Sequence, residues 1–337
     1  MAIVSVVQNA DVGLAVQEAV SLVGGIESFV RPHDKVIIKP NLVTALPSDT
    51  GLTTDPRVVQ AIIELCRCVN PSDVTIAEGS GGADTKMAFE KCGYSELARR
   101  YDVKLMDLNE SETTMVDVPA GKAFQVLGVP NIILESDVLI NVPKLKLYGS
   151  LYGRRGASLS IKNLLGAVPG KGEYSQISSP EFPFKYSSEF WMPEGKFFLP
   201  HHRQWGGPKG EKKRVHTDFA EGIVDLNTVI RPSLTVIDGI IVCPDPHITY
   251  IRDPKTLELN TILASRDPLA LDCIATKIGG LNPLDIKYLK RAAERGLGES
   301  DYNRIQVVGT PLCKIARAWE TGLANLQGNP ESRRTIV

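Results

Sequence analysis

The sequence repeatedly places a short apolar run, typical of a buried β-strand, before a helical pattern, with polar residues in between. Apolar runs at 35–38, 74–77 and 138–141 each end on polar residues or glycine, and amphipathic helical patterns separate them. Strands joined by helical crossovers predict a parallel, doubly wound sheet. Ligands of such sheets bind beyond the carboxyl ends of the strands. We therefore expect the polar residues after these runs to line one cleft.

The same alternation returns in the second half of the chain, with strand patterns at 234–237, 261–264 and 305–308. A chain of 337 residues is long for one core and suits two domains. We predict an α/β fold of two lobes with mainly parallel sheets around a cleft. The expected parts are a first α/β lobe at 1–148, a helix with an aromatic insertion at 149–215, a second α/β lobe at 216–312 and a peripheral tail at 313–337.

The insertion differs in character from both lobes. Residues 170–214 hold nine of the 21 aromatic residues and five prolines, without helical or strand periodicity. Long segments of this kind are usually lids, binding loops or disorder, and disordered segments are poor in aromatics. We expect either a lid over the cleft or an arm that contacts a second copy of the chain through residues 174–205.

Composition and charge exclude several classes of function. A net charge of −1 gives no general argument for nucleic-acid binding. The start of the chain lacks a secretory pattern, and no apolar run approaches the roughly 20 residues of a transmembrane helix, so we expect a cytoplasmic protein without a membrane partner. The six cysteines form no CxxC pair and the five histidines no HExxH spacing, so we expect no zinc or iron–sulfur motif and name no cofactor.

Cationic and amide side chains follow two of the strand runs. Lys39 and Asn41 flank a proline that keeps the backbone extended, which directs both side chains past the sheet edge. Lys144 and Lys146 are two residues apart, so in extended backbone they share one side. Such groups suit a bound carboxylate or phosphate, although a lysine after a strand can equally be a solvated surface residue.

Residues 157–168 read as a helix that carries Lys162 and Asn163. Ser158 stands four residues before Lys162 and is expected on the same helix face, but the spacing is not the SxxK of known acyl-enzymes. We therefore favour ligand contacts by Lys162 and Asn163 over nucleophilic catalysis, and keep Lys162 among the catalytic candidates.

A glycine-rich loop follows the strand run at 74–77. Glu78 begins it, and Gly79, Ser80 and Gly81 offer backbone N–H groups that can form an anion nest before the next helix. The loop lacks the full GxGxxG spacing and is not a Walker loop, so it supports nucleotide binding only weakly. A tight turn explains it equally well. Glu78 itself suits a catalytic base or a partner for a nearby lysine.

The second block contributes mainly acids to the expected cleft. Asp238 follows the run at 234–237, and Arg266 and Asp267 follow the run at 261–264. Asp267 precedes a proline and is well placed as a helix N-cap, a role that alone would explain it. Asp238 and Asp267 are catalytic candidates, and Arg266 is a candidate for substrate binding.

These segments, taken in order, resemble the family known as domain of unknown function 362, whose members are often described as iron–sulfur-centre proteins. The resemblance covers roughly residues 35 to 310 and implies the fold and the site positions, but no reaction. Many members append ferredoxin-type cysteines, which this chain lacks, and members typically have a shorter connection after the Lys-Asn-Leu helix. The matching stretches are VIIKPN at 36–41, TDP at 54–56, DVLINVPKLK at 137–146, IKNLLG at 161–166, IDG at 237–239 and DPLALD at 267–272.

The leading hypothesis is an enzyme that binds an anionic small molecule in a lysine-lined cleft between the lobes and uses a carboxylate for acid–base chemistry. Isomerisation, proton transfer or reduction fits better than hydrolysis, because the sequence shows no triad or metal set. One alternative is a non-catalytic redox or assembly partner of a separate iron–sulfur protein. A third is a nucleotide-binding protein that uses the glycine-rich loop.

Overall fold

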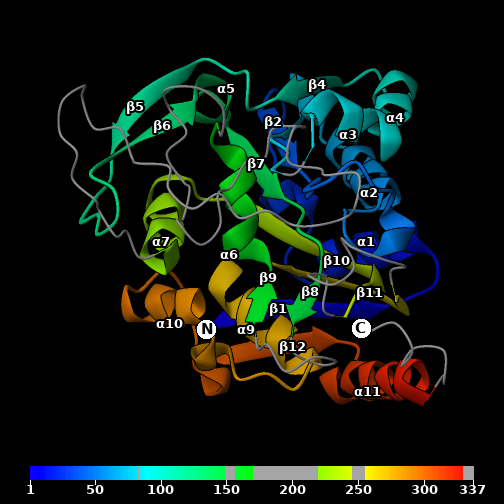
Figure 1. Cartoon of the computed structure of the whole chain (residues 1–337). Coiled ribbons are helices and arrows are strands. Elements are labelled where there is room, and N and C mark those ends of the chain that lie inside the picture. The colour runs from blue at the N-terminus through cyan, green and yellow to red at the C-terminus, as the bar shows by residue number, and fades with distance from the viewer. Residues whose placement is uncertain (82, 149–155, 170–218, 245–254, 329–337) are drawn as a thin grey trace, which may run out of the picture.

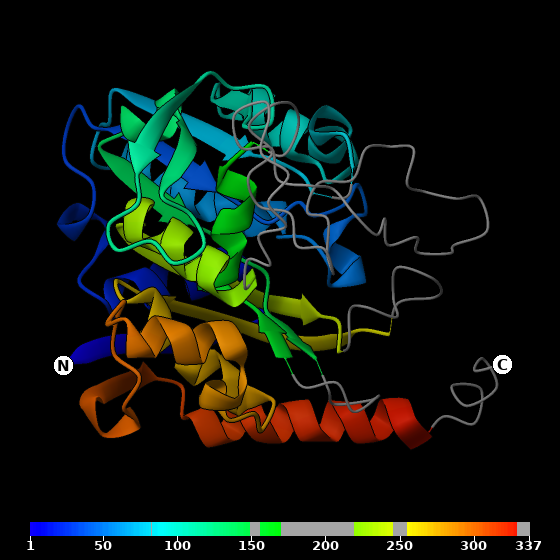
Figure 2. The ribbon, with the colours of Figure 1, turned by 60° about the vertical axis from the view of Figure 1, so that its left-hand side comes forward.

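The computed structural model describes residues 1–81, 83–148, 156–169, 219–244 and 255–328 (Figure 1). The aromatic segment at 170–214, with the predicted lid or arm at 174–205, lies outside the described residues. Within the described part, a large sheet separates two groups of helices (Figures 1 and 2). This confirms the predicted α/β class.

The central sheet has eight strands in the order β12-β1-β11-β10-β7-β2-β3-β4. Every neighbouring pair is parallel except the two that involve β11, which runs against both β1 and β10. The sheet is therefore mainly parallel, as the sequence predicts. Its strands are β1 (Ala2–Gln8), β2 (Lys35–Lys39), β3 (Asp73–Glu78), β4 (Lys104–Asp107), β7 (Val138–Asn141), β10 (Leu234–Val242), β11 (Leu257–Ser265) and β12 (Ile305–Gly309).

Two apolar cores lie on opposite faces of this sheet. Strand β2 shows how they form, because Val36 and Ile38 enter one core while Ile37 enters the other, as the two-residue repeat of a strand requires. The first core is covered by α1 (Val12–Ser21), α2 (Pro56–Arg67), α3 (Thr85–Lys91) and α4 (Tyr94–Arg100). The second is covered by α5 (Asn131–Leu134), α6 (Ser160–Asn163), α7 (Phe219–Val229), α9 (Pro268–Ile278), α10 (Lys287–Glu294) and α11 (Leu312–Gly328).

The expected pair of lobes is not what the sheet shows. Strand β1, from the start of the chain, lies between β12 and β11, and β10 pairs directly with β7. Strands from both halves of the chain thus form one sheet, because β1 pairs with β11 and β12, the last two strands of the chain. The sequence pattern indicated β7, β10, β11 and β12 but not their order in the sheet.

Several short elements were not predicted from the sequence. A hairpin of β5 (Thr113–Asp117) and β6 (Val126–Pro130) and a second hairpin of β8 (Lys146–Tyr148) and β9 (Gly156–Ser158) both lie outside the main sheet. Short 3-10 turns complete the fold at η1 (Ile26–Ser28), η2 (Ser48–Thr50), η3 (Leu164–Ala167), η5 (Pro283–Asp285) and η6 (Tyr302–Arg304). In the described segments, no helix has the length and apolar character needed to cross a bilayer.

A buried carboxylate joins two helices of the second core. Asp272 on α9 accepts hydrogen bonds from the backbone N–H groups of Ser160 and Ile161 at 2.8 and 3.1 Å, and thereby holds the start of α6. Its side chain is fully buried. Burial raises the pKa of Asp272 to about 7, because the charged form loses its hydration, although these hydrogen bonds oppose the shift.

The raised pKa predicts a pH-dependent contribution to stability. The folded state keeps the Asp272 proton between about pH 4 and pH 7 while the unfolded state releases it, so this group lowers stability as the pH rises through that window. Asp272→Asn should remove this loss, on the order of 4 kcal/mol. Urea unfolding across the window measures it, with the exposed Asp285→Asn as control. Equal pH slopes for Asp272→Asn and the unmodified protein would contradict the prediction.

Candidate functional site

The candidate site lies at the carboxyl edge of β2, β3 and β7. Lys39 ends β2 opposite Asn141 of β7, and Glu78 ends β3. The ammonium Nζ of Lys39 donates to Glu78 Oε2 at 2.7 Å and to the carbonyl of Pro40 at 3.1 Å. Both side chains of the ion pair are buried. Burial lowers the pKa of Lys39, and the charge of Glu78 opposes that change.

Glycine at position 166 makes room for this ion pair. A Cβ atom there would lie 2.3 Å from Glu78 Oε1 and 2.9 Å from Lys39 Nζ. The carbonyl of Gly166 also accepts a hydrogen bond from the N–H of Gly79 at 3.0 Å. The turn η3 therefore packs its backbone directly against the end of β3.

A second buried ion pair lies between β7 and β10. Lys144 Nζ donates to Asp238 Oδ2 at 2.8 Å, and both side chains are fully buried. The same carboxylate accepts the backbone N–H groups of Asp55 at 2.7 Å and Ile240 at 2.9 Å. Asp238 was predicted to follow its strand, but β10 continues to Val242, so Asp238 lies within the sheet as the counter-ion of Lys144.

A directional chain of side-chain amides lies between these ion pairs. Asn41 Nδ2 donates to Asn163 Oδ1 at 2.9 Å, Asn163 Nδ2 donates to Asn141 Oδ1 at 2.8 Å, and Asn141 Nδ2 donates to the carbonyl of Ser160 at 3.0 Å. Each amide oxygen thus accepts a donor from the previous residue. The remaining oxygen, Asn41 Oδ1, accepts a hydrogen bond from Lys146 Nζ.

Lys146 and Lys162 differ from the two paired lysines. In the part of the chain that the structure describes, no carboxylate lies within ion-pair distance of either ammonium group. Lys146 is only 4% exposed. Lys162 is partly buried and lies 5.8 Å from the ring centre of Tyr148. The site therefore holds two cationic groups that no described acid neutralises.

The environment lowers the pKa of both unpaired lysines. Burial brings the pKa of Lys146 to about 7, and the neighbouring charges of Lys162 and Lys144 add to this change. Burial brings the pKa of Lys162 to about 8. Both ammonium groups can therefore release protons near neutral pH, which suits anion binding as well as acid–base work.

The glycine-rich loop does not act as the expected anion nest. The N–H of Gly79 is bound to Gly166, and the N–H of Ser80 donates to Thr85 Oγ1 at 3.2 Å. Asp84 then caps α3 by accepting a hydrogen bond from the N–H of Met87. A Cβ atom added at Gly81 would meet nothing within 4 Å. The N–H groups of Gly79 and Ser80, which were expected to bind an anion, instead form hydrogen bonds within the protein.

Arg266 and Asp267 lie away from the other candidates. Because β11 runs antiparallel, its carboxyl end lies at the edge where its neighbour β10 begins. Asp267 is the predicted N-cap of α9 and accepts from the N–H groups of Leu269 and Ala270. The Arg266 guanidinium lies 3.9 Å from the ring centre of Phe29. The sequence missed this separation because it does not reveal strand direction.

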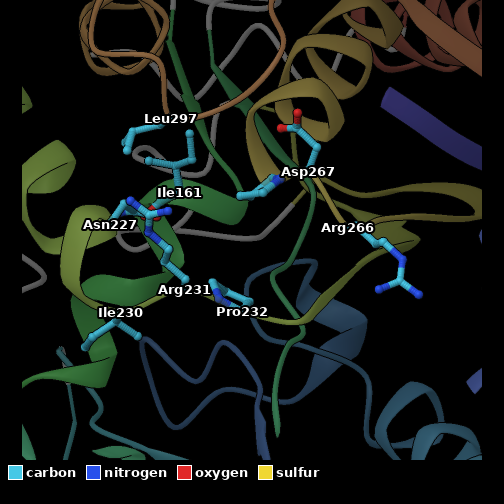
Figure 3. Close-up of a pocket in the computed structure, with 9 residues that line it drawn as sticks. Ile161, Asn227, Ile230, Arg231, Pro232, Arg266, Asp267 and Leu297 are labelled. Carbon is cyan, nitrogen blue, oxygen red and sulfur yellow. The ribbon is translucent and has the colours of Figure 1, made fainter. Parts of the chain in front are cut away.

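A pocket of about 290 Å³ lies beside Asp267 and does not include the lysines (Figure 3). Arg266 is turned away from the other residues that line it. One residue that lines the pocket, Ile161 of α6, directly precedes Lys162 in the chain. This helix therefore has the pocket at Ile161 and the amide chain at Asn163.

The predicted helix at 157–168 is shorter than expected. Ser158 belongs to strand β9, and α6 begins at Ser160. Ser158 and Lys162 are therefore not one helical turn apart on a common face, which removes the basis for a serine–lysine pair. Lys162 and Asn163 do lie on a helix, and the side-chain amide of Asn163 forms hydrogen bonds with Asn41 and Asn141.

Two residues near the site were missed in the sequence. Asn141 follows a strand run just as Lys39 does, so the same rule would have found it. Cys243 follows β10 directly, is buried, and lies near enough to Lys146 to affect its pKa. Its position becomes apparent only once the true end of β10 is known. Among the described residues, no group of three or more histidine, cysteine or acidic side chains is placed to hold a metal ion.

Comparisons with known proteins identify the relatives of this chain. A family model described as domain of unknown function (DUF362) matches residues 36–277. A thylakoid-associated protein of Synechocystis sp. is 28% identical over 276 residues, which are 82% of this chain and 71% of that protein. The lactate racemase apoprotein of Thermoanaerobacterium thermosaccharolyticum aligns with a TM-score of 0.37 and 15% identity, over 76% of this chain and 54% of that one.

The space around Gly166 predicts a large effect of a small substitution. Gly166→Ala should push Glu78 away from Lys39 and lower the free energy of unfolding by about 1–3 kcal/mol, because the added carbon meets the ion pair. Urea unfolding measures the loss. Gly81→Ala, which adds the same carbon in open space, is the matched control. An equal effect of both substitutions would refute this explanation.

Removing one partner of the buried pair should cost far more than removing an exposed one. Asp238→Ala leaves Lys144 buried without its counter-ion and should lower stability by about 3–5 kcal/mol. Asp73→Ala, which removes the exposed partner of Lys104, should cost less than about 1 kcal/mol. Chemical denaturation of both variants tests this difference, and a cost for Asp238→Ala as small as that for Asp73→Ala would contradict it.

Proposed function

Since the chain belongs to the family described as domain of unknown function (DUF362), whose description names no reaction, we propose a function from the site itself. The protein is an enzyme that binds an anionic small molecule, a carboxylate or a phosphate, at the lysines beyond β2 and β7. It then carries out acid–base chemistry on the bound molecule, as an isomerisation, a proton transfer or a reduction.

One observation carries the proposal: Lys39 and Lys144 have carboxylate partners within 2.8 Å, whereas Lys146 and Lys162 have none among the described residues. Unpaired charges in a buried site are costly. A bound anion would relieve this cost and would raise the pKa of both lysines. The arrangement therefore supports an anion as the missing partner.

The other residues have distinct parts in this proposal. Asn41 and Asn163 position the ammonium of Lys146, through the hydrogen bond to Asn41 Oδ1. Glu78 is the acid–base group, because it ends its strand at this edge and its carboxylate is held by Lys39. Asp238 keeps Lys144 in place. Arg266 and Asp267 belong to the opposite edge and have no part in the site.

Ligand-induced stabilisation tests the proposed anion site. Succinate or phosphate at 100 times its dissociation constant should stabilise the protein by about 2.7 kcal/mol, seen as a rise in Tm. Lys162→Met should abolish the rise, while the exposed Lys104→Met should preserve it. The same rise in both variants would overturn the site. Stabilisation by ATP or NAD alone would favour a nucleotide-binding protein, and stoichiometric iron in anaerobically purified protein would favour a redox partner.

The lowered pKa values also predict how binding depends on pH. The anion requires charged lysines, and Lys146 and Lys162 lose their charges around pH 7 and 8. The dissociation constant for succinate should therefore rise between about pH 6 and pH 9, by up to about tenfold per pH unit for each lysine that titrates. Calorimetric titration measures this dependence. A constant affinity across this range would contradict the proposed role of the lysines.

Location and partners remain predictions of the sequence. A related protein bears the name thylakoid-associated, so association with a membrane surface is an alternative to a purely cytoplasmic location. A homo-oligomer formed through residues 174–205 and a separate redox partner are further proposals. None of them changes the chemistry proposed for the lysine site.

A further inference from the structure

Lys146 has an unusual position among the lysines of the site. It begins β8, next to the end of β7, and its side chain is almost completely withdrawn from water. Its Nζ donates a hydrogen bond to Asn41 Oδ1, an uncharged acceptor. Lys39 and Lys144, at comparable burial, each donate to a carboxylate instead.

The nature of the acceptor determines which form of an amine is stable there. A carboxylate strongly favours the ammonium ion, whereas an amide oxygen carries no charge and can also accept a hydrogen bond from a neutral amine. The chain of amides fixes the orientation of Asn41, because its Nδ2 is committed to Asn163 Oδ1. Nearby cationic charges from Lys144 and Lys162 disfavour a further charge on Lys146. These features are those of a lysine activated as a nucleophile.

We propose that Lys146 forms an imine with the carbonyl carbon of a 2-oxo acid, whose carboxylate is held by the ammonium of Lys162. This inference rests on the anion site proposed above and names its substrate class. The division of labour follows from the surroundings of the two lysines: Lys162 is partly exposed and keeps part of its hydration as an ammonium ion, whereas Lys146 is 4% exposed and donates to an uncharged amide oxygen.

The covalent step balances without a further reagent. The lone pair of the neutral Lys146 nitrogen attacks the carbonyl carbon, and the C=O π electrons move to oxygen. The two protons of the nitrogen then leave with that oxygen as water, so that amine and ketone give imine and water. The imine, once protonated, withdraws electrons from the neighbouring carbon and makes its proton easier to remove. We assign the role of base to Glu78, the carboxylate that ends β3 at this site and whose charge acts on Lys146.

Reductive trapping tests the imine directly. The full-length protein is incubated with pyruvate, reduced with sodium cyanoborohydride, digested and mapped by mass spectrometry. One N-(1-carboxyethyl) group, the product of reducing the imine, is expected on Lys146, at a yield well above that of the isopropyl group obtained with acetone, which lacks the carboxylate. Lys146→Met should show no such adduct and should remain folded, because the variant removes a buried charge that has no acidic partner. The surface variant Lys104→Met should label as the unmodified protein does.

A second variant changes the acceptor and not the nucleophile. Asn41→Asp places a carboxylate beside Lys146, which should raise the pKa of the amine and lower the trapping yield at neutral pH about tenfold per unit of pKa change. The yield should recover as the pH rises. In the unmodified protein the yield should increase from about pH 6 to pH 8, while succinate binding weakens over the same range.

The outcomes separate this inference from the function on which it rests. Absence of an adduct on Lys146, together with stabilisation by succinate that Lys162→Met abolishes, would overturn the imine and leave the anion site in place. An adduct found chiefly on another lysine, or a yield unaffected by Asn41→Asp, would also overturn it. Absence of both the adduct and the stabilisation would overturn the imine and the anion site together.

Discussion

The neutralisation of two buried lysines by two buried carboxylates determines the arrangement of this site. Lys39 and Glu78 connect β2 to β3, and Lys144 and Asp238 connect the segment after β7 to β10. A buried ion pair contributes little net stability, but the loss of one partner is expensive. The pairs therefore constrain how the strand ends meet. Gly166 packs against the first pair, and Asn163 of the amide chain donates to the same Pro40 carbonyl as Lys39.

The same charge balance explains why a function can be proposed without a known reaction. Two lysines are compensated by acids and two are compensated by none of the described residues, so the site carries a local excess of positive charge. The amide chain accounts for the position of Lys146 without supplying a charge. A bound anion would neutralise the charges of Lys146 and Lys162. Without an anion, the buried Lys146 amine would lose its proton more easily and so become a better nucleophile.

The sequence predicted the class of fold and many of the site residues because both depend on local patterns. Strand runs, the helix cap at Asp267, and polar residues after strands follow from the chemistry of neighbouring positions. The order and direction of strands depend on contacts between distant parts of the chain. Because β1 pairs with β12, strands expected in two lobes form one sheet. Because β11 is antiparallel to β10, Asp267 lies at the end of the sheet where β10 begins, away from the lysines. Likewise, β10 extends beyond Asp238 to Val242, so that Asp238 is the counter-ion of Lys144 within the sheet and not a free acid after the strand.

The protonation of Lys146 is the most direct measure of this account. NMR titration of the protein with isotope-labelled lysine, assigned through Lys146→Met, gives the pKa of that amine with and without succinate. We expect a pKa of about 7 in the free protein and a higher value when succinate is bound. A pKa near the ordinary lysine value of 10.5 in the free protein, unchanged by succinate, would contradict it.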